Sequence, residues 1–224
     1  MMLLHGALND HADWALYLAL ACTFACAIWA IRSSGLTRVA STADAIPLGL
    51  MGLGQLALPH LAGSIVEGLS FYPLLTALSA LMFGFRYSFL LALTVQLMNV
   101  WAGLGELTSI GISLWITHWI PACWTLGLLA VCQRYLPRNL FVYLLLNGFF
   151  GASLAMIWVQ FGATGILLGL SDLSWAYLKQ YYLPFGLMLS FPEGFITGAF
   201  LTMLVLFQPQ WVYTFRDEVY QLKS

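Results

Sequence analysis

One carboxylate inside a long apolar run constrains this chain more than any other feature. Glu193 lies in the stretch SFPEGFITG, residues 190–198, within an apolar run from about 183 to 207. Such a run can cross a bilayer as a helix, and it places Glu193 roughly 15 Å deep, near the middle of a core about 30 Å thick. An acidic group there costs about 2.5 kcal/mol or more. The rest of the chain must therefore shield, protonate or pair it.

The composition supports a membrane-embedded chain throughout its length. The sequence has 224 residues, of which 61% are hydrophobic and 8% are charged, whereas soluble domains carry about 25% charged residues. We therefore expect an all-α, polytopic helical bundle that forms a single integral-membrane domain over residues 1–224. The net charge of -1 provides no basic field for nucleic acid.

Hydrophobicity predicts about seven transmembrane segments, with boundaries accurate to a few residues. The second to the fourth segments are short or rich in Gly and Pro, so tilted, broken or re-entrant helices are expected among them. The seven segments are approximately 12–31, 44–63, 69–85, 87–103, 108–132, 139–160 and 183–207.

The basic residues predict the orientation of these segments. Seven of the eight Lys and Arg residues follow the odd-numbered segments, and only Lys179 falls on the opposite side. By the positive-inside rule the N-terminus lies outside and the C-terminus lies in the cytoplasm. Residues 1–11 then form an outer N-terminal segment. Residues 208–224 form a cytoplasmic tail, which is expected to lie along the membrane interface or to contact a partner.

Several polar residues fall within the predicted spans and are candidates for an intramembrane site. Glu193 and His118 lie at similar predicted depths, and Asn99 and Gln96 lie in the fourth segment. Ionisable groups in membranes usually face the bundle interior and often mark an ion or substrate path. A His and a Glu at one depth can pair, share a proton or bind a divalent cation. The alternatives are a protonated carboxyl group bonded to a neighbouring helix and a packing histidine bonded to a carbonyl group.

A second group of candidates lies on the predicted outer side. His5 and His11 precede the first segment, and His60 lies at the outer end of the second. Imidazole nitrogens suit borderline transition metals, so these three residues are candidate metal ligands. Chance occurrence in a short terminus is the alternative.

Small residues in two segments are candidates for helix packing or for docking on a partner subunit. Ala15, Ala19, Cys22 and Cys26 share one face of the first segment, and Gly194 and Gly198 repeat the small-xxx-small pattern in the last. Such faces let helix backbones approach closely, either within the chain or across a subunit interface. The two thiols could also hold a soft metal, although packing thiols are commoner.

No nucleotide-hydrolysis motif is present. The chain contains no G-x-x-x-x-G-K-[ST] sequence, and it also lacks G-x-S-x-G and H-E-x-x-H. We therefore expect a non-enzymatic chain, and any uphill transport requires ATPase activity from another subunit.

Three stretches resemble a known family of transport proteins. Residues 70–84, 96–98 and 105–111 resemble the middle of the substrate-binding M subunit (CbiM/NikM type) of energy-coupling-factor ABC transporters for cobalt and nickel, and residues 193–198 resemble its last helix. Residues 136–143, 148–152, 182–194 and 210–215 resemble a proteobacterial branch of energy-coupling-factor transporter permeases. The resemblance implies a membrane T-type subunit and cytoplasmic ATPases as partners.

The chain departs from this family at the positions that bind metal in it. The resemblance implies a second-residue His, a later Ser-x-His motif and a downstream Asn, whereas this chain has Met2, Tyr72 and Ser113. A square nitrogen site of that design cannot be carried over. Either His5, His11 or His60 substitutes, or metal transport has been lost.

The preferred hypothesis is a substrate-capturing subunit, in a bacterial inner membrane, for a divalent transition-metal ion that is bound as substrate. Glu193 and His118 would line or gate its interior. The alternative is a non-transporting accessory subunit of a larger membrane complex. A membrane enzyme that uses His118 and Glu193 as an acid–base pair is the third hypothesis, and no motif names its reaction.

Overall fold

The computed structural model describes residues 13–34, 42–61, 63–66 and 69–215. The first helices are α1 (Asp13–Ser34), α2 (Thr42–Ala57) with the 3-10 turn η3 (Leu58–Leu61), and α3 (Thr76–Trp101). Three longer helices each consist of an α, a π and a second α stretch in succession. These are α4 (Ile110–Leu114), η4 (Trp115–Trp119) and α5 (Ile120–Tyr135); α6 (Leu140–Val142), η5 (Tyr143–Phe150) and α7 (Gly151–Leu170); and α8 (Trp175–Tyr177), η6 (Leu178–Tyr182) and α9 (Leu183–Phe207).

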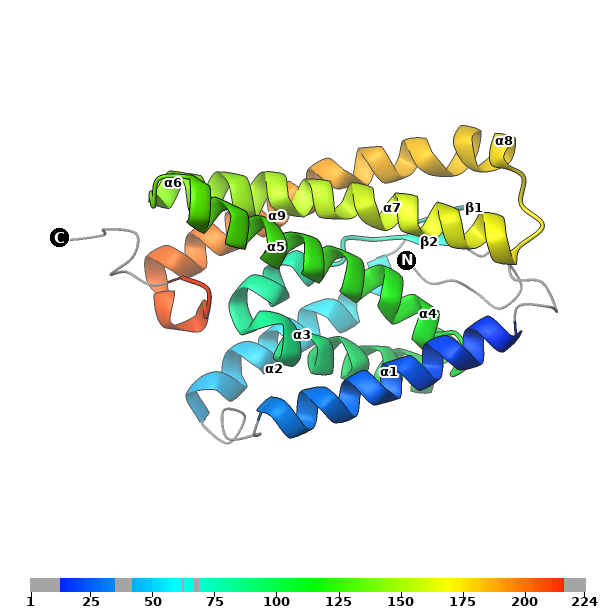
Figure 1. Ribbon diagram of the computed structural model, residues 1–224, viewed down its shortest axis with the longest axis horizontal. Coiled ribbons are helices and arrows are strands. Elements are labelled where there is room, and N and C mark those ends of the chain that lie inside the picture. Colours follow the sequence, from blue (N-terminus) through cyan, green and yellow to red (C-terminus); the bar gives the residue numbers. More distant parts are fainter. Residues whose placement is uncertain (1–12, 35–41, 62, 67–68, 216–224) are drawn as a thin grey trace.

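Five helices within the described residues are long and apolar enough to cross a membrane. They are 13–33, 76–101, 110–135, 140–170 and 175–207. Large apolar side chains such as Leu53, Met188 and Phe207 are exposed on the outside of the bundle, as expected for groups that face lipid. The prediction of an all-α, multi-pass membrane bundle is confirmed (Figure 1). The count of seven helices and the orientation stay predictions.

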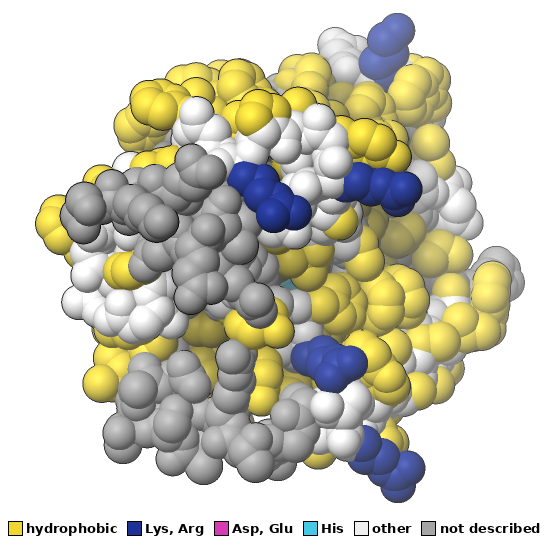
Figure 2. All heavy atoms as spheres, turned by 60° about the vertical axis from the view of Figure 1, so that its left-hand side comes forward, with side chains coloured by type: hydrophobic (Ala, Val, Ile, Leu, Met, Phe, Trp, Pro, Cys, Tyr) yellow, Lys and Arg dark blue, Asp and Glu magenta, His cyan; other side chains and the backbone are white. Residues whose placement is uncertain are grey.

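The described arginines gather at one end of the bundle. Arg32 and Arg134 lie in the last turns of α1 and α5, and Arg138 lies just before α6. Arg86 joins them, because its Nη1 donates to the Ser33 carbonyl oxygen at 3.0 Å. Among the described residues, this face shows basic side chains and no acidic ones (Figure 2). The opposite end carries Lys179, so the grouping agrees with the predicted alternation.

The third predicted segment is wrong in its helical extent. The second, predicted to end at about residue 63, is helical to Leu61, and Gly63–Val66 then forms strand β1, which pairs antiparallel with β2 (Leu69–Phe71) at the start of the third. Residues 72–75 have no regular structure. Pro73 accounts for part of this difference, because proline disfavours the helical conformation of the residue before it. We call residues 72–75 the entry segment.

The third and fourth predicted segments join in one helix, α3, that is interrupted at Gly84. This residue has φ 74° and ψ 175°, a conformation that is essentially restricted to glycine. Residues 76–83 therefore form a separate short helix, the half-helix, about 12 Å long at 1.5 Å per residue. The half-helix is too short to span a bilayer, and it lies between the entry segment and the arginine-rich end.

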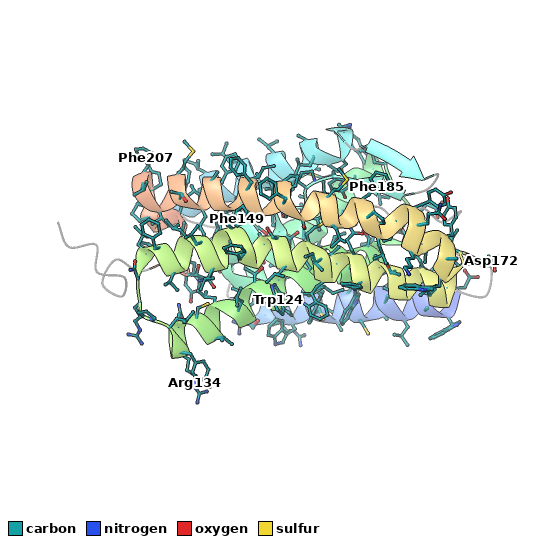
Figure 3. The ribbon with its side chains drawn as sticks, turned by 90° about the horizontal axis from the view of Figure 1, so that it is seen from above. Trp124, Arg134, Phe149, Asp172, Phe185 and Phe207 are labelled. Atoms are coloured by element: carbon teal, nitrogen blue, oxygen red, sulfur yellow. The ribbon has the colours of Figure 1, made fainter. Side chains whose placement is uncertain are left out.

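Close glycine contacts set the packing of the last two long helices. A Cβ at Gly194 would clash with the Ser153 Oγ and would lie 2.6 Å from the Phe149 carbonyl oxygen, and one at Gly198 would lie 3.3 Å from the Phe149 Cβ. Figure 3 shows the helices 140–170 and 175–207 side by side, with Phe149 labelled. Because these glycines have no side chain, α9 can lie directly against η5 and α7.

The chain beyond α9 folds back into the bundle. The turn η7 (Pro209–Trp211) leads to Val212 and Phe215, which are buried. The Tyr213 N–H donates to the Met82 carbonyl oxygen at 2.8 Å. Residues 208–215 of the predicted tail therefore pack on the half-helix, where Val212, Phe215 and two N–H groups find partners, and the position of the tail at the membrane interface stays a prediction. Residues 216–224 lie outside the described part.

Candidate functional site

A small polar pocket lies where the entry segment, both parts of α3, η4 and α2 meet. It holds about 30 Å³, which is enough for roughly one or two water molecules or a single ion. An organic substrate of vitamin size would not fit this volume. Its lining residues are Gln55, Tyr72, Leu74, Thr76, Ala92, Val95, Gln96, Asn99 and Thr117.

Hydrogen bonds between elements hold the wall of this pocket. Gln55 Nε2 donates to the Leu74 carbonyl oxygen at 3.4 Å, and the Thr76 hydroxyl donates to the Thr117 carbonyl oxygen at 2.8 Å. On the other side, Gln96 Nε2 donates to Ser113 Oγ at 3.1 Å. The two glutamine amides thus use their nitrogens in the wall, and their side-chain oxygens make none of these bonds.

The groups available to a ligand in the pocket are neutral oxygens and amides. The Tyr72 hydroxyl and the Asn99 side-chain amide form no hydrogen bond with another described residue. Hydroxyl and amide oxygens bind hard and borderline cations without balancing their charge. The described residues contain no group of three or more His, Cys, Asp or Glu side chains that could hold a metal ion. The pocket alone is therefore an incomplete metal site.

Glu193 lies behind the pocket wall and is not one of its lining residues. Its Oε2 accepts from the Leu74 N–H at 2.7 Å, and its Oε1 accepts from the Leu75 N–H at 2.9 Å. The carboxyl group, which is 3% exposed, thus caps the start of the half-helix with both oxygens. Leu75 has φ 53°, a left-handed conformation that is strained for leucine. Two successive N–H groups turned toward one carboxylate stabilise this conformation.

His118 has other partners than Glu193. It is fully buried in η4, its Nε2 lies 3.1 Å from Ser88 Oγ, and the rings of Phe85 and Phe89 contact it edge-on. No described residue bonds its Nδ1. Glu193 is engaged by the entry segment and His118 by Ser88 of α3, so the two do not form the pair that the sequence allowed, and neither lines the pocket.

The outer candidates lie away from the described pocket or outside the described residues. His60 lies in η3, is exposed, and does not line the pocket. His5 and His11 lie outside the described residues. Of the predicted intramembrane residues, the structure brings only Asn99 and Gln96 together at the pocket, where Gln55 joins them.

The small-residue face of α1 lies against the chain itself. A Cβ at Gly111 would lie 2.5 Å from the Leu20 backbone nitrogen and 2.9 Å from the Ala19 carbonyl oxygen, so α4 packs directly on α1. Ala15, Cys22 and Cys26 on this face are partly buried. These contacts and those of Gly194 and Gly198 lie within one chain, and docking on a partner stays a prediction.

Sequence reasoning missed Leu74 and Leu75, which shape the pocket wall from the backbone, and it assigned no role to the Thr214 hydroxyl. Thr214 Oγ1 donates to the Leu81 carbonyl oxygen at 2.7 Å, at the far end of the half-helix from Glu193. The contributions of Leu74 and Leu75 come from main-chain groups, which carry no sequence signature. Pro73 was the available signal, since a proline at this place argues against a continuous helix.

Comparison with known families decides the class of this chain. A family model described as "CbiM: Cobalt uptake substrate-specific transmembrane region" matches residues 8–211. The chain belongs to this family. It is thus a transmembrane component of a transporter of the CbiM type, and a transport role rather than an enzymatic one fits it. Comparisons with curated proteins and with solved structures gave no match.

The pocket lies at positions that the CbiM resemblance associates with metal. Tyr72, which stands in place of the second metal-binding His, lines the pocket. Ser113, which stands in place of the expected Asn, accepts the hydrogen bond from Gln96. Two of the positions at which the sequence departs from that resemblance thus lie in the pocket wall or next to it.

Proposed function

We propose that this chain is the substrate-capturing membrane subunit of an energy-coupling-factor-type transporter, and that its substrate is a divalent transition-metal ion. The observation that carries the proposal is the polar pocket lined by Tyr72, Gln96 and Asn99 in a chain of the cobalt-uptake family. Its volume suits an ion, and its donors are groups that bind cations.

A dication in this pocket needs further ligands, because neutral donors do not offset the cost of burying its charge. The sequence supplies His5, Asp10 and His11 in the N-terminal segment and His60 in the turn η3. We propose that imidazoles from this group complete the site from the outer face. The expected signature is weaker ion binding in His5→Ala and His11→Ala variants than in a variant of an exposed residue such as Gln180→Ala.

The energy for transport must come from other subunits. The chain has no phosphate-binding loop, so it works with cytoplasmic ATPases and a membrane T-type subunit in the bacterial cytoplasmic membrane. The arginine-rich end, with Arg86, Arg134 and Arg138, is the end that would meet the cytoplasmic subunits under the positive-inside rule.

Metal-dependent thermal stabilisation of the purified protein tests the proposal. An ion at about 100 times its dissociation constant stabilises the folded state by roughly 2.7 kcal/mol, which raises the midpoint by on the order of 5 °C. Cobalt, nickel, zinc and copper are compared in wild type, Asn99→Leu and Gln180→Ala. We expect one of these metals to stabilise wild type and Gln180→Ala but not Asn99→Leu.

Wild-type protein that no metal stabilises would sink the metal proposal. Identification of the proteins that co-purify adds a second readout. An ATPase and a T-type subunit fit the transport proposal, whereas a stable complex without an ATPase would favour the accessory role.

A further inference from the structure

The half-helix is held at both ends by segments far away in the sequence. At its start, the Glu193 carboxylate accepts from Leu74 and Leu75, which lie 119 and 118 residues before it. At its end, Gly84 interrupts α3 and leaves the last carbonyl groups of the half-helix without partners within it. The half-helix therefore depends on contacts from outside for its position.

Residues 213–214 supply those contacts at the arginine-rich end, and we call them the clamp. The Tyr213 N–H donates to the Met82 carbonyl oxygen at 2.8 Å, and the Thr214 N–H donates to that of Leu81 at 3.3 Å. The Thr214 hydroxyl also donates to the Leu81 carbonyl oxygen, at 2.7 Å. Two residues of the clamp thus satisfy two free carbonyl groups.

A buried tyrosine fixes the hydroxyl of the clamp. Tyr143 is fully buried, and its hydroxyl lies 2.7 Å from Thr214 Oγ1. Because Thr214 Oγ1 has one proton and gives it to the Leu81 carbonyl oxygen, Tyr143 must be the donor to Thr214. The bonds therefore run in one direction, from Tyr143 on η5 through Thr214 to the half-helix.

The half-helix connects the clamp to the pocket. Leu74 and Thr76 at its start line the pocket, whereas Met82 and Phe83 at its end lie beside Tyr213 in a shallow groove at the arginine-rich end. Its two ends carry the left-handed Leu75 and the glycine-only conformation of Gly84, which are the places where a rigid helix can tilt or slide. A shift of about 1 Å at either end reaches the other, because the short helix between them is stiff.

We propose that Thr214 is a positioning residue for the pocket, and that it acts through the half-helix. With the clamp in place, the half-helix holds Tyr72, Leu74 and Thr76 in the pocket wall. Displacement of the clamp at the arginine-rich end releases the half-helix and opens the wall. A partner that contacts residues 209–214 thereby changes the affinity of the pocket, and occupancy of the pocket changes the clamp in return. The effect on substrate rests on the proposed function, whereas the mechanical link does not.

Hydrogen–deuterium exchange in the purified full-length chain tests the link. Thr214→Val removes the hydroxyl, Thr214→Ser keeps it, and Thr202→Val is the matched control, because Thr202 Oγ1 makes a 2.7 Å bond to the Gly198 carbonyl oxygen within its own helix. In Thr214→Val we expect exchange of the amides of residues 74–79 to rise about fivefold, the factor for one neutral hydrogen bond. Thr214→Ser and Thr202→Val are expected to match wild type.

The far end of the half-helix distinguishes positioning from local support. If Thr214→Val raised exchange only in residues 81–83 and 213–215, or if Thr202→Val had the same effect at residues 74–79, the proposal would be wrong. Where Thr214→Val does not fold, Tyr143→Phe serves instead, because it removes the donor to Thr214 and leaves the main-chain bonds of the clamp.

Cobalt binding supplies the second readout. In Thr214→Val we expect cobalt affinity to fall about fivefold and Thr214→Ser to restore it. Wild-type protein that binds none of cobalt, nickel, zinc and copper, together with raised exchange at residues 74–79 in Thr214→Val, would refute the metal proposal and leave the link standing. Normal cobalt binding in every variant with unchanged exchange would refute the link alone.

Discussion

Glu193 is the residue on which the polar interior depends. Its burial follows from the sequence, because an apolar run on either side leaves it no route to water. Its partners do not follow, since they are the main-chain N–H groups of Leu74 and Leu75, more than 100 residues away. Two predictions were made for Glu193: a carboxyl group hydrogen-bonded to a neighbouring helix, and a pair with His118. The first is closer to the observed geometry. The carboxyl group, however, bonds the start of a broken helix and accepts with both oxygens.

Replacement of Glu193 by glutamine should destabilise the protein although the shapes are similar. One atom of the amide still accepts, but its NH2 group faces a backbone N–H, so one buried donor loses its partner. The expected loss is about 1–3 kcal/mol. Thermal unfolding in detergent measures it, with the exposed Glu106→Gln as control. Equal midpoints for the two variants would contradict the capping role.

Gly194 is expected to tolerate no side chain. An added Cβ meets the Ser153 Oγ and, at 2.6 Å, the Phe149 carbonyl oxygen, and a backbone atom cannot move aside easily. Gly194→Ala should cost about 1–3 kcal/mol of stability. Gly165→Ala is the control, because a Cβ there meets nothing within 4 Å and should be neutral or slightly stabilising. The same midpoint in both variants would show that α9 does not pack as described.

At the scale of elements, the long helices were predictable, and a broken helix was expected among the second to fourth segments, but the place of the break in α3 was not. The predicted runs 108–132, 139–160 and 183–207 are apolar, so the bilayer dictates helix there, whereas the turns by which one helix continues to residue 170 and the next begins at residue 175 were not predicted. Residues 69–75 are equally apolar, but they form a strand and then the entry segment. Irregular backbone at membrane depth is stable only where protein satisfies its polar groups. The carboxylate of Glu193 does so here for the Leu74 and Leu75 N–H groups, and the side-chain amide of Gln55 does so for the Leu74 carbonyl oxygen.

Gly84 should be intolerant of alanine for a reason other than crowding. A Cβ there would lie 3.5 Å from the Tyr213 ring, an ordinary contact, so the cost comes from φ 74° with ψ 175°. We expect Gly84→Ala to lose about 1–3 kcal/mol. Gly127→Ala in α5, where nothing lies within 4 Å, is the control. The thermal unfolding midpoints of the two variants measure this loss. A Gly84→Ala midpoint equal to that of wild type would show that α3 can continue through this residue.

At the scale of the whole molecule, the arginines at one end predict the orientation of the bundle. Arg32, Arg86, Arg134 and Arg138 were assigned to the cytoplasmic side from the sequence, and the structure places them at one end. Lys179 lies at the other end, with Asp172. The pocket lies between the ends, and the half-helix points from it toward the arginines.

Reporter fusions test this orientation. A reporter that works only outside the cytoplasm should be active when it is inserted after Asp172. A reporter that works only in the cytoplasm should be active when it is fused to Ser224, because seven of the eight basic residues are predicted on the inner side. Activity of both reporters on the same side would contradict a single crossing of the membrane by the helix 175–207. It would also move the pocket relative to the outer face.

The account as a whole depends on an ion in the polar pocket, and equilibrium dialysis of the purified protein against radioactive cobalt measures this directly. We predict one ion per chain in wild type, and affinity reduced about tenfold or more in Tyr72→Phe and Asn99→Leu, the loss expected for one ligand worth about 1.4 kcal/mol. Gln180→Ala should bind as wild type does. Wild-type protein that binds neither cobalt nor, in the same assay, nickel, zinc or copper, or variants of the pocket that bind the metal with unchanged affinity, would contradict the account.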